Sequence, residues 1–258
     1  VVRTNDHKFY VIRVYRKGIH SQSNIMYEID VLNYLKGKGI HVADPMPRNN
    51  GEYLSSLEAP EGTRHVALFR YAAGKEPTFE DKVQAYQYGK AEASLHAATA
   101  DFASSYDRLP LDLENLIDTP LRLMQPFLAT RAKDWDYLLE TARRLRDCLI
   151  SLPLSKLDYG FCHGDVHGWN ANFDEEGTVT FYDFDTCGPG WRTYDLATFC
   201  WSSKLRKEEE NRWSPFVQGY KERRELNNVN WRAVPLFIGV RHLWYMGYNA
   251  EVSQDLGI

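Results

Sequence analysis

The sequence lacks long apolar segments, an excess of basic residues and a basic-then-apolar leader. Its longest uninterrupted apolar run, from Ala233 to Val240, covers eight residues and contains Pro235, so it is far too short to cross a bilayer. Without a leader, nothing in the sequence indicates secretion. Lys and Arg number 31 against 35 Asp and Glu, and the net charge of −4 argues against nucleic-acid binding, which needs a basic face. We therefore expect neither a membrane nor a nucleic acid as a partner.

Cysteine is also scarce, because the chain has four, widely spaced and without a C-x-x-C pair. This spacing favours free thiols in a reducing compartment, so a cytoplasmic location is expected. The 258 residues allow one large domain or two modest lobes, and 43% hydrophobic with 26% charged residues exclude a disordered chain. The cysteines are Cys148, Cys162, Cys187 and Cys200.

The first seventy residues are predicted to form a sheet with one helix. Residues 8–15 and 64–71 are rich in β-branched and aromatic side chains, a composition typical of strands, and residues 1–3 should pair with the first of them as a hairpin. Residues 21–38 have helical periodicity and end at glycines. The apolar face of this helix consists of Ile25, Ile29, Leu32 and Leu35.

From Thr78 onward the pattern is mainly helical. Residues 160–183 interrupt it with two short apolar runs, Phe161-Cys162 and Val179 to Tyr182, joined by an Asp-Glu-Glu-Gly turn. The charge runs at 204–212 and 221–225 are predicted to be solvated helix faces. We expect a sheet-rich lobe at 1–72, a connector near 71–74 and a helical lobe at 73–258. Helices are predicted at 78–99, 134–151, 193–226 and 230–250.

The most informative stretch lies within residues 161–196. His163, Asp165 and Asn170 follow the H-x-D-x-x-x-x-N spacing of a kinase catalytic loop, which chance would produce roughly 0.03 times in a chain of this composition. Asp183 follows Asn170 at the end of an apolar strand, within Asp183-Phe184-Asp185. A loop followed by a short hairpin can bring a carboxylate and an amide oxygen to one hard cation.

Each of these residue types has a role in phosphoryl transfer. Mg²⁺ neutralises the nucleotide phosphates through oxygen ligands, so Asp183 and Asn170 suit the metal, while Asp165 would accept the proton of the attacking hydroxyl. Taken singly, an Asp or Asn in such a loop closes a turn, and His163 is better explained as a packed, hydrogen-bonded scaffold residue. His167 completes an H-x-D-x-H pattern, which leaves a transition-metal site open.

The same segment resembles the aminoglycoside phosphotransferase and choline kinase superfamily, in which H-G-D-x-H-x-x-N precedes a strand ending in D-F-D and then D-L-A. The resemblance extends over nearly the whole chain. It implies an α+β, bilobal protein-kinase-like fold, with a small antiparallel-sheet N-terminal lobe and a larger, mostly helical C-terminal lobe. It makes Asp165 the catalytic base and assigns Asn170 and Asp183 to Mg²⁺. Asp185 would approach a second metal or the phosphates, and Asp195, with His163, would support the catalytic loop.

The resemblance also implies a nucleotide site in the small lobe. Arg13 takes the position of the kinase strand Lys, and Glu28 on the following helix is its expected partner. The hinge whose backbone pairs with the base of ATP or GTP would be Phe69, Arg70, Tyr71 and Ala72. The phosphate-covering loop of the family would precede Val1, and further helical material would follow Ile258.

The expected function is therefore ATP- or GTP-dependent phosphorylation of a hydroxyl group on a small molecule. The sequence is most similar to the homoserine kinase and bacterial stress-response kinase branches, and residues 101–150 and 204–258 should build the acceptor surface. Three alternatives stay open: a Ser/Thr protein kinase of the stress-response type, a nucleotide-binding pseudokinase, and a metal-dependent hydrolase using His163, Asp165 and His167. The acceptor and the oligomeric state are not determined by the sequence.

Overall fold

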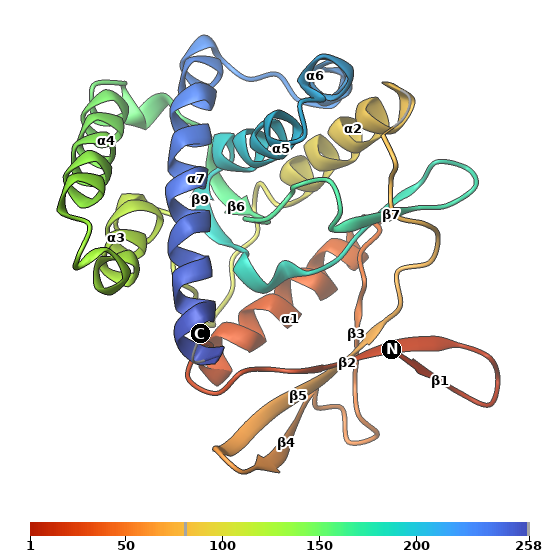
Figure 1. Cartoon of the computed structure of the whole chain (residues 1–258). Helices are drawn as coiled ribbons and strands as arrows, with labels where there is room; N and C mark the ends of the chain where they lie inside the picture. Colours follow the sequence, from red (N-terminus) through yellow and green to blue (C-terminus); the bar gives the residue numbers. More distant parts are fainter. Residues whose placement is uncertain (80–81, 257–258) are drawn as a thin grey trace.

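A computed structural model describes residues 1–79 and 82–256, and it has an α+β fold in two parts (Figure 1). The smaller part is a five-stranded antiparallel sheet in the order β1-β2-β5-β3, with β4 also paired to β5. Val11 faces Phe69 and Arg13 faces Ala67 in the β2–β5 register, which fixes the sides on which these residues lie. The strands are β1 (Val2–Arg3), β2 (Phe9–Val14), β3 (Pro45–Met46), β4 (Leu54–Ala59) and β5 (Gly62–Arg70).

Helix α1 (Gln22–Gly37) packs beside this sheet because one face of it is apolar. Its predicted face is confirmed, since Ile25, Ile29, Leu32 and Leu35 are all buried. The helix begins with a capping box, in which the Ser21 hydroxyl accepts the backbone N–H of Asn24 at 3.1 Å.

The larger part is mostly helical, and the long helix α7 runs along one side of it beside α3, α4 and α5 (Figure 1). Two small antiparallel pairs, β6–β9 and β7–β8, carry the chain between α4 and α5. The strands are β6 (Tyr159–Cys162), β7 (Ala171–Phe173), β8 (Val179–Phe181) and β9 (Gly188–Trp191). The α-helices are α2 (Lys82–Ala98), α3 (Thr119–Met124), α4 (Ala132–Ile150), α5 (Thr193–Leu205), α6 (Glu209–Arg223) and α7 (Asn228–Leu256). Single π or 3₁₀ turns are η1 (Glu114–Asp118), η2 (Gln125–Leu128), η3 (Leu154–Lys156) and η4 (Phe184–Thr186).

Three sequence predictions of secondary structure were wrong in detail. The helix predicted at 193–226 is two helices, because the chain turns at Lys207, which has a left-handed φ of 60°. The helix predicted from 78 cannot include Phe79, whose φ is 53°. The Asp-Glu-Glu-Gly turn joins β7 to β8, whereas the run Phe161-Cys162 lies in β6 and pairs with β9.

All four cysteines are free thiols, and three of them are buried. Burial raises the pKa of Cys187 and of Cys200 to about 12, so both stay protonated at neutral pH. Among the described residues, no helix has both the length and the apolar character needed to span a bilayer.

Helices α2 and α6 approach each other closely because glycine occupies the contact on both sides. A methyl group added at Gly219 would overlap the backbone carbonyl oxygen of Tyr86, and one at Gly89 would overlap that of Phe216. The two helices therefore pack backbone against backbone.

We expect Gly219→Ala to lower the free energy of unfolding by about 1–3 kcal/mol, because α6 must move away from α2 to admit the methyl group. Urea denaturation measures the difference. Gly37→Ala is the matched control, since a methyl group there meets no atom within 4 Å, and alanine favours a helix. Equal stability of the Gly219→Ala protein and the wild type would contradict the close packing.

Candidate active site

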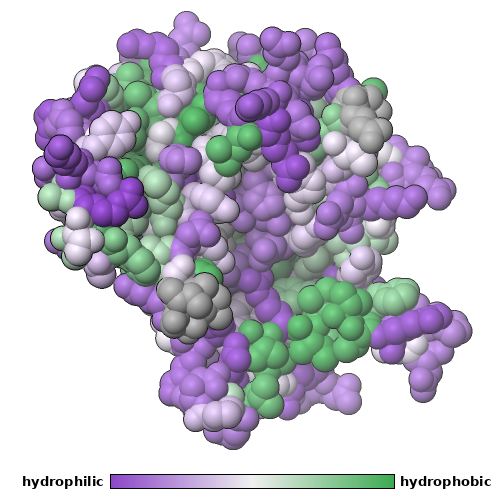
Figure 2. Space-filling view, viewed as in Figure 1, coloured by the Kyte–Doolittle hydropathy of each residue, from purple (hydrophilic) through white to green (hydrophobic). Residues whose placement is uncertain are grey.

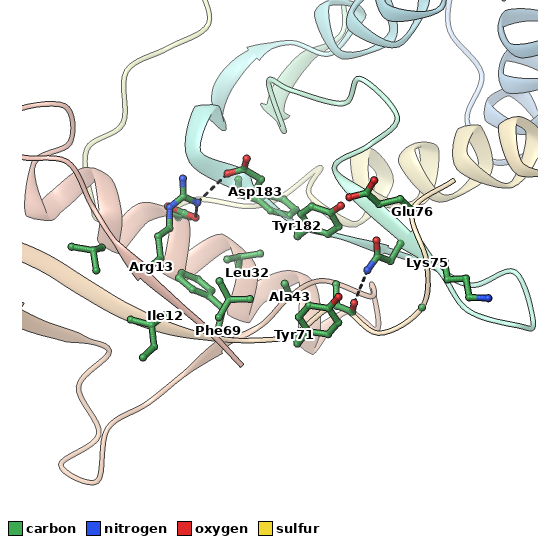
Figure 3. Close-up of a pocket in the computed structure, with 17 residues that line it drawn as sticks. Ile12, Arg13, Leu32, Ala43, Phe69, Tyr71, Lys75, Glu76, Tyr182 and Asp183 are labelled. Atoms are coloured by element: carbon green, nitrogen blue, oxygen red, sulfur yellow. Dashed lines mark hydrogen bonds and ion pairs between the residues drawn. The ribbon is translucent and has the colours of Figure 1, made fainter. Parts of the chain in front are cut away.

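A cavity of about 810 Å³ lies between the small sheet and the helical part, and Figure 3 shows the side chains around it. Tyr71 and Ala43 lie toward one end, while Arg13 and Asp183 meet at the other. Figure 2 shows apolar side chains gathered over the sheet in the lower part of the view. The lining residues are Val11, Ile12, Arg13, Val14, Glu28, Leu32, Ala43, Phe69, Tyr71, Ala72, Gly74, Lys75, Glu76, Asn172, Tyr182, Asp183 and Phe184.

Most of the residues predicted to hold the nucleotide line this cavity, and Arg70 does not. The Arg70 guanidinium instead donates to the Asp44 carboxylate at 3.0 Å, because alternate residues of a strand point to opposite sides. At the predicted hinge, the Asn172 side chain donates to the Ala72 carbonyl oxygen at 2.7 Å and ties the connector to β7.

Arg13 lies among three carboxylates at the end of the cavity away from Tyr71. Its guanidinium lies 3.4 Å from Glu28, 3.1 Å from Asp183 and 2.9 Å from Asp185. Burial alone would lower the pKa of Arg13, but the surrounding carboxylates raise it, so Arg13 stays charged. Burial raises the pKa of Glu28 against the opposing effect of Arg13, and the Tyr15 hydroxyl donates to Glu28 at 3.1 Å.

A second cavity, of about 440 Å³, opens beside the first. Asp183 lines both cavities, whereas Asp165 lines only the second. Asp183 follows β8 with a left-handed φ of 62°, which turns its side chain outward and leaves it 47% exposed. The lining residues of the second cavity are Asp165, His167, Trp169, Asp183, Asp185, Thr186, Trp201, Ser202, Leu205, Arg206, Arg241, Trp244, Tyr245 and Tyr248.

Asp165 is held from two sides. The Asn170 side-chain amide donates to the Asp165 carboxylate at 3.0 Å and to its backbone carbonyl at 2.9 Å, and Arg241 pairs with the other carboxylate oxygen. Burial alone would raise the pKa of Asp165, but Arg241, His167 and His163 together hold it below its usual value. Asp165 is therefore ionised and oriented at neutral pH.

A buried network fixes the loop that carries Asp165. The Asp195 carboxylate accepts the backbone N–H groups of His163 and Gly164 at 2.7 and 2.8 Å, and His96 contacts the same carboxylate at 3.1 Å. The ring of His163 lies inside the fold, 3.1 Å from the Tyr182 carbonyl oxygen. These contacts make the start of the loop rigid.

The donor types of the predicted metal ligands suit a hard cation. Carboxylate and amide oxygens of Asp183, Asp185 and Asn170 are the ligand types that Mg²⁺ prefers. By contrast, the part of the chain that the structure describes contains no group of three His, Cys, Asp or Glu side chains arranged to hold a metal. His167 lies 3.6 Å from Asp165, but the His163 ring contacts the Tyr182 carbonyl oxygen instead, so the hydrolase hypothesis gains no support.

Sequence reasoning missed Arg241 and misjudged Arg212. Arg241 is buried on α7, donates to the Gly164 carbonyl at 3.0 Å, and lies 4.4 Å from the centroid of Trp244. Arg212 was assigned to a solvated face but is 2% exposed, with its guanidinium over Phe79 and Trp169. Arg241 stands within the otherwise apolar helix predicted at 230–250, and this position was the sequence signal for a buried functional arginine. The aromatic residues packed around Arg241 and Arg212 explain why both are buried.

Comparisons with known proteins show which proteins this chain resembles. Residues 1–234 match the phosphotransferase enzyme family. A protein of Deinococcus radiodurans is 37% identical over 253 residues, which is 96% of this chain and 72% of that protein. A microcompartment-associated aminopropanol kinase superposes with a TM-score of 0.75 at 27% identity, covering 93% of this chain and 77% of that one. The amicoumacin kinase hAmiN, in a complex with AMP-PNP and Ca²⁺, gives a TM-score of 0.80 at 21% identity, covering 97% and 77%.

The predicted protein-kinase-like fold is confirmed by these superpositions, and the predicted enzyme class, a kinase, is confirmed by the family match and the related kinases. The chain belongs to the phosphotransferase enzyme family.

Proposed function

We propose that the protein transfers the γ-phosphate of ATP or GTP to a hydroxyl group of a small molecule, with Asp165 as the base. The observation that carries this proposal is the position of Asp183, which lines both cavities while Asp165 lines only the second. A phosphate group at Asp183 could thus be approached from the side on which Asp165 lies. This arrangement supports a nucleotide in the larger cavity and the acceptor in the smaller one.

The larger cavity suits a nucleotide in both its apolar and its charged parts. Leu32, Phe69 and Ala72 offer apolar walls for a base, and Arg13 at the other end carries a positive charge for phosphates. Arginine can grip a phosphate with two parallel hydrogen bonds, which makes it a competent substitute for the usual lysine. Glu28 would hold Arg13 in place.

Mg²⁺ would be held by Asp183, by the amide oxygen of Asn170 and, in a second position, by Asp185. When bound, the ion neutralises charge on the transferring phosphate and orients it. The Asn170 amide nitrogen already donates to Asp165, so its oxygen is the atom left for the metal. This shared amide would couple the position of the metal to the position of the base.

Asp165 would accept the acceptor's hydroxyl proton as that oxygen attacks the γ-phosphorus and the nucleoside diphosphate leaves. Its ionised state at neutral pH fits the task, because the proton moves late in a loose transition state. Arg241 acts through Asp165 and is a positioning residue: it fixes the carboxylate and keeps its pKa low.

Arg241→Met is expected to shift the acidic limb of the kcat/KM–pH profile to higher pH. The charge of Arg241 lowers the pKa of Asp165, so its loss raises that pKa and the base form is lost at a higher pH. Arg241→Lys keeps the charge and should restore most of the wild-type profile. A uniform fall in kcat/KM at every pH, without displacement of the limb, would assign Arg241 a purely structural role.

The related kinases support a small-molecule acceptor, since one acts on aminopropanol and another on amicoumacin by name. A nucleotide-turnover screen against amino alcohols, aminoglycosides, macrolides and a generic protein substrate tests this proposal. Acceptor-dependent ADP or GDP formation with a small molecule supports it. Turnover with the protein substrate alone would favour the protein-kinase alternative, and thermal stabilisation by Mg-nucleotide without any turnover would favour a pseudokinase.

A further inference from the structure

Each charged side chain that lines the second cavity has a partner of opposite charge, except one, although a single cation, Arg13, is shared by Asp183, Asp185 and Glu28. Asp165 faces Arg241, and Asp183 and Asp185 both face Arg13. Burial lowers the pKa of His167, so this ring is neutral at pH 7. Every carboxylate that lines the cavity thus already has a cationic partner.

Arg206 is the exception, because no carboxylate of residues 1–79 and 82–254 lies within 4 Å of its guanidinium. It is exposed at the end of α5 and lines the second cavity. Its guanidinium lies 3.9 Å from the centroid of the Trp169 ring, a stacking distance for an arginine on an aromatic face. The charge is therefore available to an occupant of the cavity.

Two features hold Arg206 at this position. Trp169 belongs to the loop that carries Asp165, and the buried Arg212 supports the same ring with its guanidinium 4.8 Å from the centroid. Arg212 pairs with Glu208, while Lys207 makes the left-handed turn after α5. Stacking leaves the edge of a guanidinium, with its N–H donors, free to bind an anion.

The remaining wall of the cavity is aromatic, and it suits the uncharged body of an acceptor. Trp201 and Tyr245 lie with ring centroids 5.0 Å apart, and Trp244 and Tyr248 stack at 5.4 Å. These four side chains come from α5 and α7, and all of them line the cavity. A cationic acceptor would find aromatic faces there but no unpaired carboxylate.

We propose that the acceptor carries a carboxylate, which binds Arg206 on its Trp169 platform while the reacting hydroxyl lies at Asp165. This inference rests on the proposed function and deepens it, because it names the acceptor class as a hydroxy acid. Arg206 is then a specificity-determining residue. The carboxylate and the guanidinium form a charge-assisted pair, so acceptors without the carboxylate lose that interaction.

Matched acceptors test the proposal with the full chain, Mg²⁺ and ATP. L-homoserine and 3-aminopropan-1-ol differ only in the carboxylate, and 4-hydroxybutyrate keeps the carboxylate without the amine. We expect kcat/KM to be higher for the two carboxylates. Arg206→Gln should lower it for them by roughly 10- to 100-fold and leave the amino alcohol unchanged. Lys207→Gln is the matched control, because it removes a neighbouring charge that does not line the cavity.

Calorimetric binding of 4-hydroxybutyrate, in the presence of Mg-AMP-PNP, separates this inference from the proposed function. Binding to the wild type and not to Arg206→Gln supports the carboxylate site even where no phosphate ester forms. Three results overturn it: a preference for 3-aminopropan-1-ol, an equal effect of Arg206→Gln on all acceptors, or no binding or turnover with either carboxylate.

Discussion

Asp165→Asn is expected to lower the rate of phosphoryl transfer by about 10²–10⁴-fold, the usual contribution of a general base, with little change in Mg-nucleotide affinity. Asp165 lines the second cavity and not the first, so its loss should act on the acceptor's proton and spare the nucleotide. Asparagine keeps the size of the side chain and a carbonyl oxygen that can still accept from Arg241.

Substitution of Asp165 by alanine is more disruptive, because it removes the whole polar group. Asp165→Ala should abolish transfer as well, and it should also lower stability, because it leaves the buried Arg241 without its carboxylate. Steady-state turnover and calorimetry with Mg-AMP-PNP measure the two effects separately. Near-normal turnover by Asp165→Asn would remove Asp165 from the role of base.

Asp183→Asn is expected to weaken Mg-nucleotide binding itself and to lower kcat/KM for the nucleotide by about 10²–10⁴-fold, the equivalent of several kcal/mol of metal stabilisation. Asp183 lines both cavities, so the loss of its charge affects the metal that would join them. Asparagine is the conservative choice, since it tolerates the left-handed φ of 62° that alanine would strain.

The effect of Asp183→Asn is measured by titrating nucleotide binding with Mg²⁺. The wild type should bind AMP-PNP more tightly as Mg²⁺ is added, and Asp183→Asn should lose most of that dependence. Asp136→Asn, an exposed position on α4, controls for the removal of one negative charge. A normal Mg²⁺ dependence in the Asp183→Asn protein would contradict its assignment to the metal.

Local patterns in the sequence predicted much of the fold. The apolar face of α1 followed from spacing, because residues three and four apart share one side of a helix, and burial of Ile29 and Leu35 agrees. The spacing of Asp165 and Asn170 likewise placed both in one loop, where Asn170 donates to Asp165. Both predictions concern residues that lie close together in the sequence.

Contacts between distant segments could not be predicted in the same way. Arg241 meets Asp165 from α7, and no periodicity states which loop a helix residue will face. Arg212 belongs to a charged run, yet aromatic rings from two other segments cover it. The turn at Lys207 was also missed, because lysine rarely adopts a left-handed conformation and gives no signal for it. Each depends on tertiary packing, which overrides local pattern.

Phosphorus NMR of the complete reaction tests the central claim most directly, that phosphate passes from a nucleotide at Asp183 to a hydroxyl at Asp165. The protein, Mg-ATP and an acceptor from the turnover screen are followed in one sample, with Asp165→Asn in parallel. We predict a phosphate monoester signal that grows in step with ADP for the wild type and is absent for the variant. Release of inorganic phosphate without a monoester, or the same monoester from Asp165→Asn, would contradict the account.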